Sequence, residues 1–322
     1  MKDVLFIKTS SLGDVIHHMP ALTEARAHWP EVRFGWVVEE AFAPLVRLHP
    51  AVNEVIPVAV RRWRQTLLRP SAWASTWAQL AAFRRTLKAR KFDEIVDTQG
   101  LLKSALIARW GEGRRRGYDS KSIKEPLASS FYDIKHPIDW NQHAIARNRA
   151  LTAEALGYAC EGPPDYGLDR NKLRAPSEKP YGVLLHATAQ ASKEWPEENW
   201  RMLTAVLGGN DIDFVALHGN DTERERALRI AGASPRVRVP ERQPLDQVAR
   251  LIAGASFVIG VDTGLLHLAA ALGVPLVAIF LGSEPKLTGP MGQGPIEVLG
   301  AKGAPPSVAE VADTVKRLAG LK

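Results

Sequence analysis

The stretch that decides the fold is FVIGVDTGLLHLAAALGVPLVAIF, residues 257–280. Its first five residues, Phe257 to Val261, are apolar and rich in β-branched side chains, which is typical of a buried parallel strand. A polar turn and a short helical segment follow, and Gly273 with Pro275 marks where that helix stops. Residues 276–280 are apolar again. The stretch therefore predicts a strand, a helix and a second parallel strand.

The turn between that strand and helix holds the residues suited to a ligand. Asp262 is expected to cap the helix by accepting a hydrogen bond from a free backbone N–H. Thr263 and Gly264 stand where unpaired N–H groups and the positive end of the helix dipole favour a phosphate. His267, one turn later, could donate to the same anion or to a ribose hydroxyl. A plain structural turn is an equal alternative, because most strand–turn–helix units bind nothing.

The same alternation of strand and helix runs through the whole chain and predicts parallel sheets with helices on both faces. Gly- and Pro-rich polar segments at 161–164 and 175–180 predict a linker between two domains. The expected fold class is α/β, with two doubly wound domains, 1–165 and 175–322, that face a cleft. The final amphipathic helix, 308–319, could pack back on the first domain. Other strand-like runs are expected at residues 4–7, 34–38, 55–58, 95–97, 182–185 and 214–217.

Length and composition limit the class of protein. The 322 residues, 45% of them hydrophobic, are enough for two domains with a core each. The single cysteine, Cys160, excludes an internal disulfide and is compatible with a reducing compartment. The N-terminus does not have the pattern of a signal peptide, and no apolar run reaches the roughly 18 residues that a membrane span needs.

The charge is distributed unevenly. Residues 1–160 hold 24 Lys and Arg against 16 Asp and Glu, whereas the remaining residues hold 18 against 19. A basic first half indicates an anionic partner or a basic solvated surface. Its cations are interleaved with Trp63, Trp73 and Trp77, which suits an anionic membrane surface. Core tryptophans beneath a solvated basic face are the alternative, and no motif supports nucleic-acid binding.

Polar groups follow several of the predicted strands. In the second domain these include Thr188, the flexible cation Lys193, which could cover a diphosphate, and Glu223, which could accept ribose hydroxyls. In the first domain the matching group is Asp14, in a turn at the carboxyl end of the strand at 4–7. Ligands of open α/β sheets bind at such ends. Asp14 is either a helix cap or a general base at the mouth of the cleft.

Motifs of several other chemistries are missing from the chain. There is no G-x-G-x-x-G after a strand, no P-loop, no H-E-x-x-H and no G-x-S-x-G. Residues 111–117 come near the first of these patterns without its strand–helix context. Residues 211–213, Asp-Ile-Asp, match the metal-binding D-x-D of one class of glycosyltransferases, but a turn is the favoured interpretation. No metal site is expected.

Several unusual strings together resemble the lipopolysaccharide heptosyltransferases, a family of GT-B glycosyltransferases, and its type I members most closely. The resemblance covers nearly the whole chain. The strings are KTSSLGDV (8–15), WVVEE (36–40), VIPVAVRRWR (55–64), DTQGLLKS (97–104), EPLAS (125–129), HAT (186–188), KEWPEE (193–198) and the pattern D-T-G-x-x-H-x-A-A-A-x-G-x-P (262–275).

The resemblance implies two Rossmann-like domains and an inverting transfer of L-glycero-D-manno-heptose from ADP-heptose to Kdo of Kdo2-lipid A. It implies no metal cofactor and a cytoplasmic protein, peripheral on the inner face of the inner membrane. Residues 1–165 would bind the acceptor and residues 175–322 the nucleotide sugar. A type II heptosyltransferase, or a related transferase with another acceptor, is one alternative. Another is a non-catalytic nucleotide-sugar or lipid-binding protein, in which Asp14 would be dispensable.

The resemblance also assigns roles to residues. Asp14 would deprotonate the acceptor hydroxyl. Donor contacts would come from phosphate-binding groups, from carboxylates that orient the sugar or ribose, and from a histidine that supports the leaving diphosphate. The donor group comprises Thr188, Lys193, Glu223, Asp262, Thr263, Gly264 and His267. The acceptor group comprises the cations Arg61, Arg62, Arg64 and Lys124, which suit carboxylates and phosphates.

Three positions depart from the family pattern. Ala189 stands where a second Thr is frequent, and residues 281–285 replace the more usual G-P-T-x-P. Lys124 stands where Arg is common, and an ammonium group cannot grip a carboxylate in the same forked way. These departures put one phosphate contact, the loop over the donor and one acceptor contact in doubt.

Overall fold

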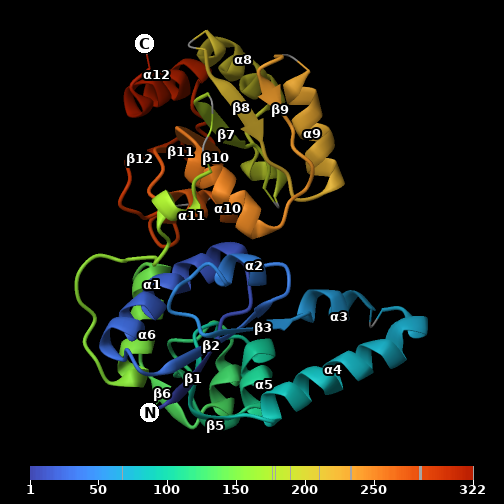
Figure 1. Ribbon diagram of the computed structural model, residues 1–322, viewed down its shortest axis with the longest axis vertical. Helices are drawn as coiled ribbons and strands as arrows, with labels where there is room; N and C mark the ends of the chain where they lie inside the picture. Colours follow the sequence, from blue (N-terminus) through green and yellow to red (C-terminus); the bar gives the residue numbers. More distant parts are fainter. Residues whose placement is uncertain are drawn as a thin grey trace. The chain divides into compact units, whose positions relative to one another are not determined.

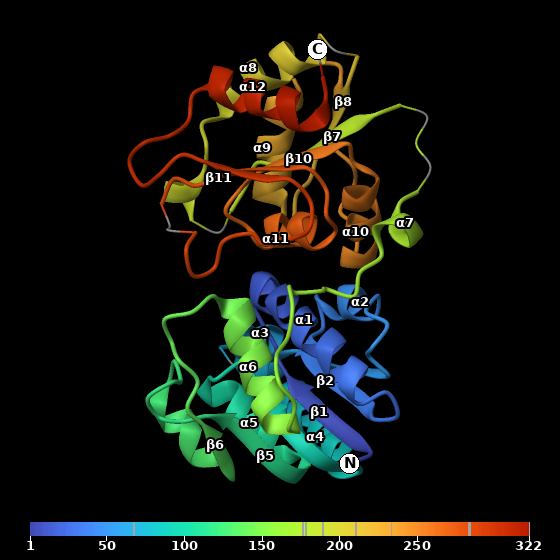
Figure 2. The same ribbon diagram turned by 90° about the vertical axis from the view of Figure 1, so that its left-hand side faces the viewer.

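The computed structural model divides into two compact units, Met1–Gly167 and Leu168–Lys322, each built around a six-stranded parallel sheet (Figures 1 and 2). Because the two units are separate bodies, each is described by itself, and the expected cleft stays a prediction. The structure describes residues 1–66, 68–175, 177, 179–188, 190–209, 211–232, 234–282 and 285–321.

In the first unit the strands lie in the order β3-β2-β1-β4-β5-β6. The six strands are β1 (Asp3–Ile7), β2 (Arg33–Glu39), β3 (Glu54–Val58), β4 (Lys91–Asp97), β5 (Glu112–Tyr118) and β6 (Ile134–His136). The helices are α1 (Leu12–His28), α2 (Ala43–Val46), α3 (Val60–Thr66), η1 (Pro70–Ala72), α4 (Trp73–Lys88), α5 (Leu102–Trp110), η2 (Pro126–Phe131) and α6 (Ala144–Leu156).

In the second unit the order is β12-β11-β10-β7-β8-β9. Its strands are β7 (Tyr181–Leu185), β8 (Asp213–Ala216), β9 (Val237–Arg238), β10 (Phe257–Val261), β11 (Leu276–Ile279) and β12 (Ile296–Leu299). Its helices are α7 (Arg170–Leu173), η3 (Ala191–Lys193), α8 (Glu197–Gly208), α9 (Asp221–Ala231), α10 (Leu245–Gly254), α11 (Gly264–Ala271) and α12 (Val308–Ala319).

The two sheets share one topology. Counted from its own first strand, each unit has the order 3-2-1-4-5-6, which is the doubly wound order of dinucleotide-binding folds. The strand order reverses between the first and fourth strands, that is between β1 and β4 and between β7 and β10. Ligands of such sheets bind beyond the carboxyl ends of the strands at this switch point. The turns after these four strands are therefore where a site is expected in each unit.

The deciding stretch folds as its sequence predicts. All five residues of β10 are buried, and the strand pairs in parallel with β7 and β11. Gly273, with a φ of +66°, ends α11 in a left-handed turn. Its N–H donates to the Ala270 carbonyl and the Val274 N–H to the Ala269 carbonyl, so both carbonyls at the end of the helix are paired. Pro275 then leads into β11.

Strand β5 was not expected, because residues 113–117 are only glycine and arginine. The strand forms between β4 and β6, where buried Glu94 of β4 receives hydrogen bonds from Arg114 and Arg116. Burial alone would raise the pKa of Glu94, but the hydrogen bonds from the two guanidinium groups outweigh it and lower the pKa. Ion pairs across the ladder thus replace the apolar alternation that marks most strands.

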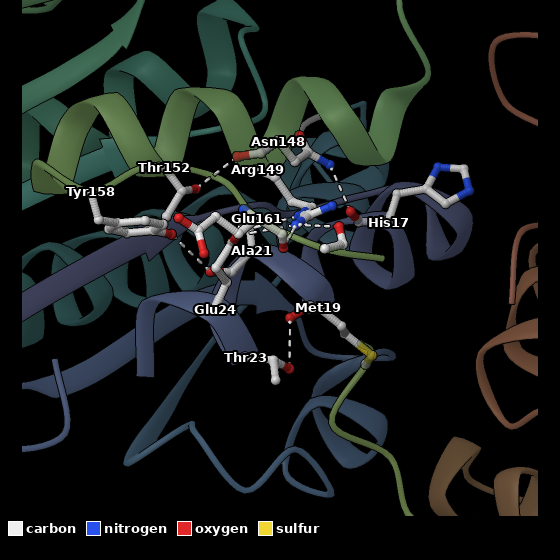
Figure 3. Close-up of polar contacts among 11 residues, drawn as sticks. His17, Met19, Ala21, Thr23, Glu24, Asn148, Arg149, Thr152, Tyr158 and Glu161 are labelled. Atoms are coloured by element: carbon white, nitrogen blue, oxygen red, sulfur yellow. Dashed lines mark hydrogen bonds and ion pairs between the residues drawn. The ribbon is translucent and has the colours of Figure 1, made fainter. Parts of the chain in front are cut away.

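Helix α6 is held against α1 by polar contacts along its length (Figure 3). Asn148 donates from Nδ2 to the His17 carbonyl at 3.1 Å, and Arg149 forms a two-pronged ion pair with Glu24 at 3.0 and 3.1 Å. Arg149 also donates to the Glu161 carbonyl at 2.7 Å, which ties down the chain that leaves the unit. These contacts fix α1, whose first turn holds Asp14.

The final helix, α12, packs within its own unit. Its buried residues Val311, Ala312 and Val315 join the core beside α8, β10 and β11. The basic helix α4 begins at Trp73. Among the described residues, no helix is both long enough and apolar enough to cross a membrane.

Two buried histidines predict how stability depends on pH. Burial lowers the pKa of His49 to about 4, and that of His186 to about 4, whereas an unfolded histidine titrates near 6.5. Below pH 6.5 the unfolded chain therefore takes up protons that the folded chain refuses. The free energy of unfolding should fall between pH 6.5 and 4, by about 1.4 kcal/mol per pH unit for each histidine.

Urea unfolding at pH 7 and pH 5 checks this expectation. His49→Gln removes one titrating group and should flatten the pH dependence by about one proton. A stability that does not change over this pH range would contradict the assignment of neutral buried histidines.

Candidate functional site

At the switch point of the first unit, between β1 and β4, two side chains from the β4 side hold the turn that follows β1. Gln99, in the turn after β4, accepts hydrogen bonds at Oε1 from the backbone N–H groups of Thr9 and Ser10, both at 3.0 Å. Lys103 of α5 donates from Nζ to Ser10 Oγ at 2.8 Å. The turn that leads from β1 into α1 is therefore held from the β4 side, immediately before Asp14.

Asp14 lies in the first turn of α1 but is not its N-cap. The helix begins at Leu12, Ser11 is the N-cap, and Asp14 is the third helical residue. The half-buried carboxylate accepts hydrogen bonds from the Ser11 N–H at 2.7 Å and from Ser11 Oγ at 3.0 Å. This is a capping box in which the acid reaches back to the turn. The expected capping role is thus present at a different helical position, and the carboxylate is oriented at the switch point.

A buried cation lies beneath this turn. Lys8 donates from Nζ to the Thr98 carbonyl at 2.7 Å and to Asn148 Oδ1 at 3.1 Å. Burial lowers the pKa of Lys8, while the negative charges of Asp14 and Asp97 act in the opposite direction. The Nδ2 atom of the same Asn148 amide donates to the His17 carbonyl of α1. One side chain of α6 therefore contacts both α1 and the lysine at the switch point.

A second group of charges surrounds Lys103. Burial lowers its pKa, and the charges of Glu39, Arg61 and Asp14 act on it as well. Glu39, at the end of β2, is itself buried, which raises its pKa, and its Oε1 accepts the Arg61 N–H at 3.0 Å. The end of β2 and the starts of α1, α3 and α5 thus bring two acidic and two basic side chains to one edge of the sheet.

The predicted acceptor cations differ in how they are held. Arg62 forms a two-pronged ion pair with Glu40, both contacts at 2.9 Å, and donates to Gln79 at 2.6 Å. The Arg61 guanidinium lies over the Phe42 ring at 5.0 Å. Arg64 and Lys124 are exposed and form no ion pair within the described part of the chain. Arg62 therefore holds α3 in place, while the other cations keep capacity for a ligand.

The structure corrects the expectation that Trp63 shares one surface with Trp73 and Trp77. Its ring is 7% exposed and meets the Phe83 ring edge to face at 5.8 Å, inside the core. Its indole Nε1 donates to Gln79 at 3.0 Å. Trp73 and Trp77, by contrast, are exposed.

At the switch point of the second unit, the turns after β7 and β10 meet. Thr188 donates from Oγ1 to the Asp262 carbonyl at 2.8 Å, and Lys193 pairs from Nζ with Asp262 Oδ2 at 2.6 Å. Asp262 therefore does not cap α11 as its sequence position suggested; the N-cap is Thr263. The carboxylate instead holds Lys193 beside the start of the helix. Both side chains keep about a fifth of their surface exposed.

The first turn of α11 is not capped by the side chain of its own N-cap residue. The Thr263 side chain forms no cap hydrogen bond, and the helix begins at Gly264, which has no side chain to shield its N–H. His267, on the next turn, is buried apart from a small fraction of its surface. Backbone donors at a helix N-terminus with a lysine beside them form an arrangement suited to a diphosphate.

Glu223 lies at a neighbouring strand end and already has partners. It is the third residue of α9, and its carboxylate accepts from the Gly219 N–H at 2.7 Å and from Asn220 Nδ2 at 2.8 Å. Asn220 in turn caps the Glu223 N–H at 2.9 Å. The structure thus brings Thr188, Lys193 and the start of α11 together after β7 and β10, and places Glu223 after β8, next to β7 in the sheet.

The departures at Ala189 and at Ser283 and Glu284 within residues 281–285 lie outside the described residues.

Asp211 and Asp213 form the turn into β8, where Arg236 pairs with them at 2.8 and 3.6 Å. In the parts of the chain that the structure describes, no three His, Cys, Asp or Glu side chains are grouped as a metal site would need.

Sequence reasoning gave no role to Gln99, Lys103 and Asn148, which hold the first switch point. Gln99 and Lys103 lie in or just after a polar turn that follows a predicted strand, so their position was a usable signal. Asn148 lies in the middle of α6, more than a hundred residues from its partners Lys8 and His17, and only the packing of α6 on α1 brings it there.

The model of glycosyltransferase family 9 (heptosyltransferase) matches residues 80–314 of this chain. The chain belongs to this family. It is a glycosyltransferase with the GT-B arrangement of two doubly wound sheets.

Curated members of family 9 resemble the chain over most of its length. It is 44% identical over 296 residues to lipopolysaccharide heptosyltransferase 1 of Salmonella typhimurium, covering 90% of this chain and 92% of the relative. The enzyme of the same name from Pseudomonas aeruginosa is 44% identical over 301 residues, 92% of this chain and 83% of the relative. Lipopolysaccharide heptosyltransferase 2 of Escherichia coli is 22% identical over 324 residues, 89% and 85% of the two chains.

Solved structures of the family have the same fold. The E. coli heptosyltransferase WaaC with ADP is 40% identical and has a TM-score of 0.88, with 98% of each chain covered. The same enzyme with ADP-2-deoxy-2-fluoro heptose gives a TM-score of 0.86 at 40% identity and the same coverage. E. coli ADP-heptose LPS heptosyltransferase II, at 21% identity and a TM-score of 0.79 over 99% of this chain and 98% of its own, shares the fold.

Lys193 provides a direct test of whether the residues after β7 and β10 bind ADP. Lys193→Met should raise the Kd for ADP about 10-fold or more, because a charge-assisted hydrogen bond to a phosphate is lost. Lys193→Arg should keep most of the affinity, and Lys302→Met, on an exposed lysine of the same unit, should keep all of it. Isothermal titration calorimetry measures the Kd for ADP of wild type and of the three variants. Equal affinities for wild type and Lys193→Met would remove Lys193 from the donor site.

Proposed function

We propose that this glycosyltransferase moves L-glycero-D-manno-heptose from ADP-heptose to Kdo of Kdo2-lipid A, in the synthesis of the lipopolysaccharide inner core. The observation that carries the proposal is the contrast in identity along the same length of chain. It is 44% with the type 1 enzymes and 22% with the E. coli type 2 enzyme. The similarity to a solved relative with a fluorinated ADP-heptose supports the choice of donor.

In the proposed reaction Asp14 is the general base. It takes the proton of the acceptor hydroxyl as that oxygen attacks the anomeric carbon of heptose from the face opposite the diphosphate. The bond from the anomeric carbon to the diphosphate oxygen breaks, and ADP leaves with the electron pair, so the configuration inverts. The two hydrogen bonds from Ser11 hold the carboxylate in one orientation, which a base must have before substrate arrives.

The donor side supplies groups for the negative charge that develops on the diphosphate. Lys193, the Thr188 hydroxyl, the N–H groups at Thr263 and Gly264, and His267 are the donors we assign to it. Fixed donors that already point to where charge develops lower the barrier most effectively. We therefore propose that no metal ion takes part. Asp262, which holds Lys193 without substrate, and Glu223 would orient hydroxyl groups of the sugar or ribose.

The acceptor side is assigned to exposed cations of the first unit. Kdo carries carboxylates and lipid A carries phosphates, and guanidinium groups bind both in forked pairs. Arg61, Arg64 and Lys124 are proposed to make these contacts, while Arg62 acts through its hold on α3. Because the acceptor is a lipid, we propose that the protein acts at the cytoplasmic face of the inner membrane as a peripheral protein.

The test of the proposed function is a transfer assay with ADP-heptose and a Kdo-lipid acceptor, comparing wild type with Asp14→Asn. An asparagine oxygen can still accept the Ser11 N–H, so the helix cap and the fold should be kept. Because the general base is lost, kcat should fall at least 10²-fold, with an unchanged Kd for ADP. The wild-type rate should persist in the presence of a metal chelator.

Other outcomes assign the chain elsewhere. Turnover with a heptosylated core acceptor, and none with Kdo2-lipid A, would make it a type 2 enzyme. Binding of ADP-heptose without any turnover would make it a nucleotide-sugar-binding protein. Wild-type turnover by Asp14→Asn would disprove the assignment of the base.

A further inference from the structure

Helices α3 and α4, with η1 between them, form an arm that extends from the sheet of the first unit (Figure 1). We call residues 60–66 and 68–88 the α3–α4 arm. Its two helices run outward and back, so the segment from Leu68 to Ala72 lies at the far end of the arm. No mechanistic step above uses this far end.

The arm is fixed to itself and to the unit by its inner face. The Gln79 side chain of α4 accepts hydrogen bonds from Arg62 and Trp63 of α3, and the hydroxyls of Thr66 and Thr76 pair at 2.7 Å. On α4 the buried residues are Thr76, Phe83 and Leu87. The other side chains of α4 are partly or fully exposed.

Large apolar side chains are exposed near the far end. Leu68 is 83% exposed, Trp73 50% and Trp77 61%. Trp73 and Trp77 are four residues apart, so they lie on one face of α4. Arg84 and Lys88, seven and eleven residues beyond Trp77, lie on the same side of the helix. One face thus runs from two tryptophans to two cations.

The charge of this segment has one sign. From Val55 to Phe92 the sequence has nine Lys and Arg and no Asp or Glu. Arg62, Arg90 and Lys91 pair with glutamates from outside the segment. The arm cations that form no ion pair with any described residue are Arg61, Arg64, Arg69, Arg84, Arg85 and Lys88. An uncompensated positive field around exposed tryptophans complements an anionic lipid surface, because indole rings prefer the headgroup region.

We propose that the α3–α4 arm docks this protein on an anionic lipid bilayer, with Leu68, Trp73 and Trp77 in the headgroup region and Arg69, Arg84, Arg85 and Lys88 against lipid phosphates. The proposal rests on the proposed function only for the lipid nature of the acceptor. Arg61 and Arg64 belong to the same arm, so docking places these acceptor cations at the surface where the acceptor's headgroup lies.

The first experiment measures binding of the full chain to vesicles of phosphatidylethanolamine and phosphatidylglycerol, and to vesicles of phosphatidylcholine alone. Trp73→Ala/Trp77→Ala should lower the partition coefficient on the anionic vesicles about 10-fold or more. The matched control, Met202→Ala/Val206→Ala, removes two comparably exposed apolar side chains from α8 of the second unit and should bind as wild type does.

The charge contribution has its own pair of variants. Arg84→Gln/Arg85→Gln/Lys88→Gln should weaken binding to anionic vesicles about 10-fold or more. The change Arg242→Gln/Arg250→Gln/Lys302→Gln, which removes the same charge from exposed positions of the second unit, should weaken it far less. Added salt should weaken wild-type binding, and phosphatidylcholine vesicles should bind little. ADP affinity, unchanged in all four variants, reports that they are folded.

Transfer kinetics separate docking from catalysis. Trp73→Ala/Trp77→Ala should keep the wild-type rate on a soluble Kdo acceptor without acyl chains and lose rate on an acceptor embedded in anionic vesicles. If each of the two arm variants binds vesicles as wild type does, the proposal is overturned, and the arm is left as a surface for a protein partner. If no acceptor is turned over, the proposed function fails, and vesicle binding still decides the docking proposal.

Discussion

One constraint governs both candidate sites: in a parallel sheet, every strand ends at the edge where the following helix begins. The first N–H groups of those helices have no partner within the helix, so each must be satisfied by a side chain, water or a ligand. In α1 the Asp14 carboxylate accepts the N–H of the N-cap residue Ser11, and in α9 the side chain of the N-cap residue Asn220 accepts the Glu223 N–H. In α11 the N-cap side chain forms no such bond. The proposed chemistry follows from this difference between the three helices.

In the proposed mechanism the same topology serves different purposes in the two units. At the first switch point a carboxylate is held by backbone and hydroxyl donors, with cations beneath and beside it, and such an environment suits proton removal from a hydroxyl. At the second, a lysine stands beside a helix N-terminus that its N-cap side chain does not cap, an environment suited to an anionic leaving group. Because the sheet fixes only where strands and helices meet, the residues in the turns decide which reaction step each unit serves.

How far sequence could predict the structure depended on whether the determining contacts were local. The strand–turn–helix at 257–280 was predicted together with its stop at Gly273, because the apolar run and the left-handed turn are properties of neighbouring residues. Strand β5 was missed because its glycines and arginines are ordered by Glu94 on another strand. Asp262 was wrongly taken as a cap because its partner, Lys193, is 69 residues away. Trp63 was grouped with exposed tryptophans because only packing on Phe83 shows that it faces the core.

The central claim is that the first turn of α11 receives the diphosphate. The most direct measurement is a titration of the protein with ADP, followed by the backbone amide NMR signals of Thr263 and Gly264. The account predicts that these two signals move furthest and saturate together with ADP binding, and that adenosine, which lacks the phosphates, moves them little. If ADP binds while both signals stay in place, or if the shifts are confined to residues 219–223, the claim is contradicted.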